Sequence, residues 1–360
     1  MGDNDSGDGP ADPESVGWTT EAPWLEAAVS AVRPERSVAS VNPVEAGGRR
    51  STLVVRFADA ELIVVRGGRG GREGKSVATE GALLAAITDR TAVPVPEPLG
   101  WGSVGGGSVG GCDETQGDGS ITEWLATRFV EGEDLHERFC GLAPTTRHRV
   151  AGSFGRCLGE LHAAFRFGGY GRIGADDRSL RSGETGDDRE RPEASAWREW
   201  LVERGRESLR RLPAEFDDIA DAARERLDAW TVETAPVPRL FPWDLRPGNA
   251  LVADGEIAAI VDWEAPLAAG AALSVAKAEH LLADWYVPGE ADALRRAFRA
   301  GYAEVRSVPV VDDVHRVVAV AEAAVDSRGQ VTNPRYPPVN RNEAVQFHRN
   351  RLGDTVGIDG

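Results

Sequence analysis

The chain has 360 residues, enough for two compact folding units, and 41% of them are hydrophobic, which suffices for buried cores. Acidic residues outnumber basic ones by 58 to 41, for a net charge of −17, and arginine carries nearly all the positive charge because only two lysines, Lys75 and Lys277, are present. A surface of this sign repels phosphate backbones, so a nucleic acid is excluded as an expected partner.

The acidic, lysine-poor composition has two interpretations. It is typical of a protein from a salt-rich cytoplasm, where dissolved ions screen the repulsion between surface carboxylates. A GC-rich genome, whose codons favour Arg, Ala, Gly and Asp, gives the same bias. We favour the first interpretation and expect a halophilic protein.

The chain shows no sign of membrane insertion, export or metal-binding cysteines. It has no run of eighteen apolar residues, and its N-terminus lacks the basic and apolar segments of a signal peptide. We therefore expect a soluble, cytoplasmic protein with no membrane partner. Its three cysteines, Cys112, Cys140 and Cys157, show no CxxC spacing, so neither a disulfide framework nor a zinc site is indicated.

The N-terminal third predicts a small β-rich unit. Residues 1–17 are rich in Asp, Gly and Pro and predict a disordered tail, and apolar residues at helical spacing then predict a short helix over 24–32. An antiparallel meander follows, with strands at 38–44, 52–57 and 61–65. A helical stretch around Glu80 comes next. Two further strands are predicted near Leu99 and over 121–130, separated by a Gly/Ser/Asp-rich loop at 102–120.

From Glu133 onward the pattern becomes helical. An apolar stripe at helical spacing consists of Val150, Phe154, Leu158, Leu161 and Phe165. Further predicted features are a polar surface insertion at 174–195, helices near 196–211 and 216–230, one β-hairpin over 250–261, and helices to about 352. Asp254-Gly255 is the expected turn of the hairpin.

This order of elements predicts an α+β protein of two lobes with a cleft between them. We expect a tail and lead-in helix at 1–35, a β-rich lobe at 36–132, and a larger helical lobe with one hairpin at 133–360.

The most informative segment surrounds this hairpin. Before it stands Phe-Pro-Trp-Asp-Leu-Arg-Pro-Gly-Asn at 241–249, and after it stands Ile-Val-Asp-Trp-Glu at 260–264. An Asp followed five residues later by Asn, and a second Asp after a short hairpin, resembles the catalytic loop and metal-binding segment of protein-kinase-like enzymes. The Pro-Gly-Asn and Asp-Trp-Glu versions resemble the aminoglycoside phosphotransferase and choline kinase branch. The resemblance spans about residues 36–300, and with the charge it suggests a divergent, haloarchaeal branch.

The resemblance implies a transfer of the γ-phosphate of ATP to a hydroxyl group of a small molecule, with Mg²⁺ required. It makes Asp244 the catalytic base or orienting group, and Asn249 and Asp262 the metal ligands. Hard oxygen ligands of this kind suit Mg²⁺ on nucleotide phosphates. Taken singly, each residue is better explained as part of an ordinary turn or cap, and only their order around a β-hairpin favours the catalytic interpretation.

In the β-rich lobe the resemblance implies a phosphate-gripping cation, Arg66, paired with Glu80, and Lys75 is the runner-up for Arg66. Phe129, Val130 and Glu131 resemble the hinge whose backbone meets adenine, although a plain strand-to-helix junction is an equal alternative. Short glycine runs at 47–48 and 67–71 are weak candidates for phosphate binding. The family often has a histidine where His162 stands, and we expect it to be a buried structural residue.

The chain also departs from the family. Pro242 stands where a loop-bracing His is usual, and Gly270 and Ser274 stand where two structural acids are usual. An active enzyme of a divergent branch is our first hypothesis. A nucleotide-binding pseudokinase with a regulatory role, and an interaction protein with an empty cleft, are the alternatives. Acidic residues at Glu264, Glu279 and Asp284 would suit a cationic acceptor, but in so acidic a chain they carry little weight.

Overall fold

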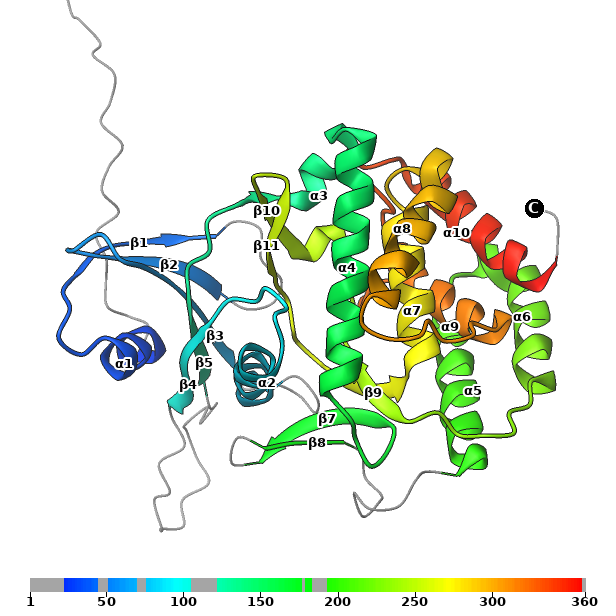
Figure 1. Cartoon of the computed structure of the whole chain (residues 1–360), viewed down its shortest axis with the longest axis horizontal. Coiled ribbons are helices and arrows are strands. Elements are labelled where there is room, and N and C mark those ends of the chain that lie inside the picture. Colours follow the sequence, from blue (N-terminus) through cyan, green and yellow to red (C-terminus); the bar gives the residue numbers. More distant parts are fainter. Residues whose placement is uncertain are drawn as a thin grey trace, which may run out of the picture.

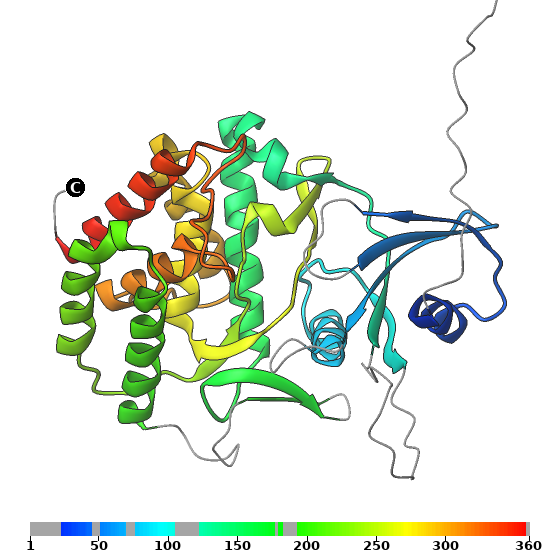
Figure 2. The same ribbon diagram turned by 180° about the vertical axis from the view of Figure 1, so that it is seen from behind.

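The computed structural model describes residues 23–44, 51–69, 76–104, 122–176, 179–182 and 193–357. Figures 1 and 2 show a β-rich part at the N-terminal end of the chain beside a larger, mainly helical part. The predicted α+β class is therefore confirmed. The predictions for the tail at 1–17, for Gly47-Gly48, for Lys75 and for Cys112 lie outside the described residues.

The β-rich part contains a five-stranded antiparallel sheet in the order β1-β2-β3-β5-β4. Its strands are β1 Val38–Pro43, β2 Ser51–Phe57, β3 Leu62–Arg69, β4 Pro98–Val104 and β5 Thr122–Arg128. The first three form the predicted meander. Gly67 and Gly68 continue β3, so this end of the predicted glycine loop is a strand.

Two helices cover the two faces of this sheet. In β5 the side chains alternate: Trp124 and Ala126 are buried against α1 (Pro23–Val32), whereas Leu125 joins the core that contains α2 (Val77–Arg90). Ser76 caps α2, because its hydroxyl accepts a hydrogen bond from the backbone of Ala78 at 3.2 Å. Figure 1 shows the two helices on either side of β4 and β5.

A short strand connects this sheet to the predicted hairpin. β6 (Glu133–Asp134) pairs with β10 (Ala250–Ala253), which pairs in turn with β11 (Glu256–Ile260). Asp254 and Gly255 between them have φ values of 53° and 76°. Positive φ at both positions is what a two-residue type I′ turn requires, so the predicted Asp-Gly turn is confirmed.

Helices make up most of the remaining chain. The described ones are α3 Leu135–Arg138, α4 Pro144–Ala164, α5 Ala194–Arg210, α6 Asp217–Ala229, α7 Ala271–Glu279, α8 Ala291–Ala303, α9 Asp313–Ala324 and α10 Arg341–Val356. The predicted stripe from Val150 to Phe165 is fully buried on α4 and at its end. A single π-helical turn, His280–Asp284, extends α7. None of the helices within the described residues has the length and apolar character needed to cross a membrane.

The prediction of a single hairpin in the helical part is wrong. A four-stranded sheet in the order β8-β7-β12-β9 lies there as well, formed by β7 Gly171–Asp176, β8 Ser179–Ser182, β9 Pro238–Phe241 and β12 Leu267–Gly270. All four residues of β9 and of β12 are buried, so no apolar-polar alternation marks them as strands. β7 and β8 occupy part of the predicted polar insertion, where charged residues concealed them.

Candidate active site

The loop with Asp244 begins where β9 ends and leads through the turn at Pro247–Asn249 into β10. Its backbone is strained: Trp243 has a φ of 36°, and Asp262 and Ala265, beyond the hairpin, have φ values of 64° and 59°. Positive φ is uncommon for residues other than glycine, and such strain tends to concentrate at functional sites. Four of the five such residues among those described lie between 243 and 265.

The structure brings the three predicted residues of this region together around the hairpin. The side-chain nitrogen of Asn249 donates to the backbone oxygen of Asp244 at 3.0 Å, which ties the two residues. The nitrogen of Val261 donates to the backbone oxygen of Asn249 at 2.8 Å. Because Ala250 pairs with Ile260, Asn249 and Asp262 lie just beyond the same end of the hairpin.

Arg66 on β3 links the two parts of the molecule. Its guanidinium donates to Glu80 of α2 at 2.6 Å and to Glu264, two residues after Asp262, also at 2.6 Å. Burial by itself would lower the pKa of Arg66, but the negative charges of Glu80, Glu264 and Asp262 together raise it above its usual value. The predicted pair of Arg66 with Glu80 therefore exists in the structure. The contact with Glu264 was not expected.

Phe129, Val130 and Glu131 lie in the irregular segment between the end of β5 and β6. The backbone nitrogen of Phe129 donates to the oxygen of Leu62 at 3.4 Å. The segment is the crossing from the sheet to the hairpin, and its role toward a nucleotide stays a prediction.

A buried cluster of charged residues beside Asp244 was not predicted from the sequence. The ammonium of Lys277 on α7 lies 3.5 Å from Oδ1 of Asp244 and 3.2 Å from Oε2 of Glu322 on α9. It also lies 4.2 Å from the centre of the Trp243 ring. Arg204 of α5 pairs with Glu322 from the other side. The signal that could have found this cluster is the lysine itself, because the chain otherwise uses arginine almost throughout.

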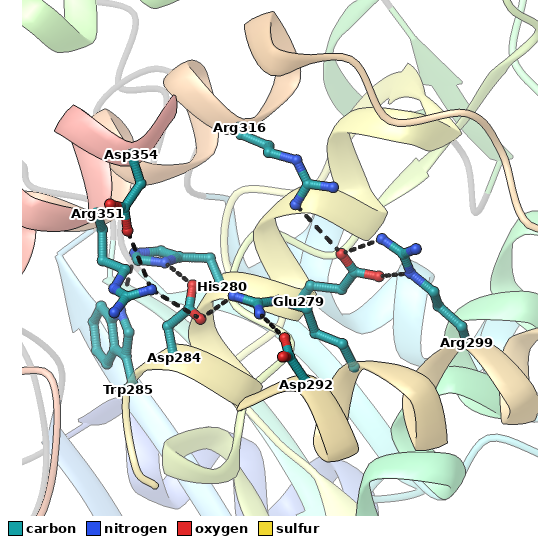
Figure 3. A network of polar contacts seen from close by, with 10 residues as sticks. Glu279, His280, Asp284, Trp285, Asp292, Arg299, Arg316, Arg351 and Asp354 are labelled. Carbon is teal, nitrogen blue, oxygen red and sulfur yellow. Dashed lines mark hydrogen bonds and ion pairs between the residues drawn. The ribbon is translucent and has the colours of Figure 1, made fainter. Parts of the chain in front are cut away.

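The acidic residues considered for a cationic acceptor are already paired with arginines. Glu264 pairs with Arg66, and Figure 3 shows the contacts of Glu279 and Asp284. Glu279 accepts from Arg299 at 3.0 Å and lies 3.7 Å from Arg316. Asp284 pairs with Arg295 and accepts from Nδ1 of His280 at 2.9 Å. Burial alone would raise the pKa of Asp284, but the hydrogen bond from His280 and the nearby arginine charges lower it. Neither carboxylate offers a free negative charge to a substrate.

His162 is fully buried in α4, as expected for a structural histidine. Its Nδ1 lies 2.8 Å from the hydroxyl oxygen of Tyr302. Burial, together with the positive charges of the nearby Arg306 and Arg239, lowers the pKa of His162 to about 3, so the ring is neutral. A neutral, enclosed imidazole is a packing element here.

Among the described residues, no group of three or more His, Cys, Asp or Glu side chains could hold a metal ion by itself. Asn249 and Asp262 form a smaller set of oxygen donors. Such a set fits Mg²⁺, which is commonly held by one or two protein ligands together with substrate phosphates. In Asn249 the nitrogen is used in the bond to Asp244, so the amide oxygen is the atom that a cation would meet.

Many solved structures resemble this chain, including the following three, which cover most of it. A thermostable mutant of aminoglycoside phosphotransferase APH(4)-Ia, in a ternary complex with AMP-PNP and hygromycin B, has a TM-score of 0.56 and 14% identity over 89% of this chain and 94% of that chain. A protein from Ralstonia eutropha JMP134, assigned by its name to the aminoglycoside phosphotransferases, has a TM-score of 0.60 and 16% identity over 92% and 96%. Macrolide 2′-phosphotransferase type I has a TM-score of 0.51 and 15% identity over 85% and 91%.

At these identities the likeness shows the fold, which is protein-kinase-like. No curated protein matches the chain in sequence. The model of the phosphotransferase enzyme family matches residues 40–308, well over half of the chain. The chain belongs to this family.

Proposed function

We propose that this protein transfers the γ-phosphoryl group of ATP to a hydroxyl group of a small molecule. The observation that carries the proposal is the tie between Asp244 and Asn249 at one end of the hairpin, with Asp262 beyond the same end. Phosphoryl transfer requires mainly positioning and charge neutralisation, and these three residues are of the right kind for both. Family membership and the likeness to phosphotransferases support it.

In the proposed reaction the acceptor oxygen attacks the γ-phosphorus, and the bond from that phosphorus to the oxygen it shares with the β-phosphate breaks. ADP leaves, and the proton of the acceptor hydroxyl passes to the carboxylate of Asp244. We assign Asn249 and Asp262 as the ligands of Mg²⁺, which when bound would neutralise the nucleotide phosphates. Asp244, Asn249 and Asp262, the residues assigned to this reaction, all lie within the described part of the chain.

We further propose that the nucleotide lies between the sheet of residues 36–132 and the part at 133–360. Arg66 would grip its phosphates, because the pair with Glu80 fixes the direction of the guanidinium. The backbone of Phe129, Val130 and Glu131 would meet the adenine at the crossing between the two parts.

The acceptor remains open within the class of small molecules that carry a hydroxyl group. APH(4)-Ia is named in complex with hygromycin B. Here Glu279 and Asp284 are neutralised by arginines, so they give no reason to favour a cationic acceptor. Neutral sugars and nucleosides therefore belong in the test beside amino sugars and amino alcohols.

The experiment is a coupled assay of ADP release in high salt against sugars, amino alcohols and nucleosides. We expect release of ADP that depends on one acceptor class and on Mg²⁺, and its loss in Asp244→Asn. If ATP and Mg²⁺ raise the melting temperature but no acceptor causes ADP release, the protein is a nucleotide-binding pseudokinase instead. If ATP and Mg²⁺ do not raise the melting temperature, the proposed nucleotide site itself is wrong.

A further inference from the structure

Asp244, the proposed base, contacts a lysine that no motif assigned. The distance between Oδ1 of Asp244 and Nζ of Lys277 is 3.5 Å. The side chain of Asp244 is 31% exposed, whereas that of Lys277 is 3% exposed. The carboxylate is therefore open to a substrate on one side, and the lysine supports it from beneath.

The position of the ammonium group is itself fixed from several elements. Glu322 of α9 accepts a hydrogen bond from Lys277 at 3.2 Å, and Glu322 also pairs with Arg204 of α5. The ring of Trp243, next to Asp244 in the chain, lies 4.2 Å from Nζ, close enough for a cation–π contact. A buried ammonium with this many partners has little freedom, so it can hold Asp244 in one orientation.

A purely structural ion pair between Lys277 and Glu322 would not need Asp244. The composition of the chain argues against that simple reading. Of 41 basic residues other than histidine, only two are lysines, so 39 are arginines. Arg204 already pairs with Glu322. A lysine differs from arginine in presenting one compact charge rather than a broad planar fork, and a compact charge fits between Trp243 and two carboxylates.

We propose that Lys277 is a positioning residue for the phosphoryl transfer, which rests on the function proposed above. By holding Oδ1 of Asp244, it leaves Oδ2 as the atom that meets the acceptor hydroxyl and receives its proton. Pro242, two residues before Asp244, has neither a side-chain donor nor a backbone N–H with which to brace the loop. Lys277 supplies that support from α7.

The test compares Lys277→Met, which keeps the length of the side chain and removes its charge, with Glu279→Gln on the same helix. Glu279 is also buried, and its ion pairs are with Arg299 and Arg316 and do not involve Asp244. In Lys277→Met we expect kcat to fall by about 10- to 100-fold, the scale of a misplaced reacting group, with KM for ATP nearly unchanged. In Glu279→Gln we expect a lower melting temperature and an unchanged kcat. Equal kcat values in the two variants overturn the proposal.

A second comparison separates positioning from general destabilisation. In the Asp244→Asn background, Lys277→Met should cause little further loss of kcat, because the residue acts through the carboxylate that is already gone. A full additional loss overturns the proposal. If Lys277→Met does not fold, Lys277→Arg is measured instead: it retains the charge in a different shape, so kcat should still fall more than KM changes, and an unchanged kcat overturns the proposal.

The wild-type assay distinguishes this inference from the proposed function. If the wild type releases ADP with an acceptor and Lys277→Met does so equally well, only the inference fails. If the wild type is inactive with every acceptor, the proposed function fails as well. The melting temperatures of Lys277→Met, Asp244→Asn and the double variant then show whether the two side chains interact at all, and a non-additive shift in an inactive protein assigns the pair to stability alone.

Discussion

Arg66 on β3 is hydrogen-bonded at once to Glu80 on α2 and to Glu264 beyond the hairpin, each at 2.6 Å. Arg66 and Glu264 are 198 residues apart in the chain. One guanidinium therefore joins the sheet, the helix packed on it and the segment with Asp262. Glu80 is 2% exposed, so its charge is held in a fixed place.

This arrangement predicts that Glu80→Gln weakens ATP binding by about tenfold, or ~1.4 kcal/mol, which is near the lower limit for a hydrogen bond to a charged group. Without the charge of Glu80, the guanidinium turns toward Glu264 and away from the phosphates. Calorimetric titration with ATP and Mg²⁺ measures the effect. Glu97→Gln is the control, because Glu97 pairs with Arg128 on the surface. Equal ATP affinities in the two variants would show that Arg66 does not bind the phosphates.

Asp244→Asn should separate binding from chemistry. The substitution preserves the shape of the side chain and removes its negative charge, so ATP affinity should stay nearly the same. Turnover should fall by about 10²- to 10⁴-fold, the usual contribution of a positioned acid or base. The measurement is ATP affinity and acceptor-dependent ADP release on the same preparation. A variant that turns over like the wild type would exclude Asp244 as the base.

Substitution of the two proposed metal ligands should weaken nucleotide binding to different extents. Asp262→Ala removes a charged ligand, so nucleotide affinity should fall in the presence of Mg²⁺ and change little in its absence. Asn249→Ala removes a neutral amide and should have the same effect more weakly. Titration of ATP with Mg²⁺ and with a chelator measures both. If Asp262→Ala binds MgATP as tightly as the wild type, Asp262 is not a metal ligand.

The packing of α4 against α8 provides a test of the fold. A Cβ atom added at Gly155 would lie 1.9 Å from the backbone oxygen of Phe298, a contact that backbone movement alone can relieve. Gly155→Ala should therefore lose about 1–3 kcal/mol of stability, more than the roughly 1 kcal/mol that alanine gains over glycine within a helix. Urea unfolding measures it. Gly141→Ala, whose Cβ would have no neighbour within 4 Å, is the control and should be nearly neutral.

The net charge of −17 predicts that stability depends on salt. Ions screen charges beyond about 10 Å at 0.1 M and beyond about 3 Å at 1 M, so repulsion between surface carboxylates weakens as salt is added. The melting temperature should rise between 0.1 M and roughly 2 M KCl, and the fold should loosen below a few tenths molar. Sorbitol at equal osmolality should not reproduce the rise. A melting temperature independent of KCl would favour a compositional origin of the charge.

Local patterns were sufficient to predict much of this protein. The meander, the stripe on α4 and the Asp254-Gly255 turn follow from periodicity and turn chemistry within a few residues. The spacing of Asp244, Asn249 and Asp262 around a hairpin is sufficient to indicate the family. β9 and β12 were not predicted, because all four residues of each strand are buried and the strands therefore lack the alternation of apolar and polar residues that indicates a strand.

The sequence by itself determined most of the order of the elements, the sign of the net charge, and Asp244, Asn249 and Asp262 as the proposed catalytic and metal-binding residues, because each of these depends on composition or on neighbouring positions of the chain. Only the tertiary structure decided which charges meet. It paired Glu279 and Asp284 with arginines, joined Arg66 to Glu264, and placed Lys277 under Asp244. Such pairs come from separate elements that converge only when the core packs. In a chain with 99 charged residues, 58 acidic and 41 basic, composition alone cannot select them.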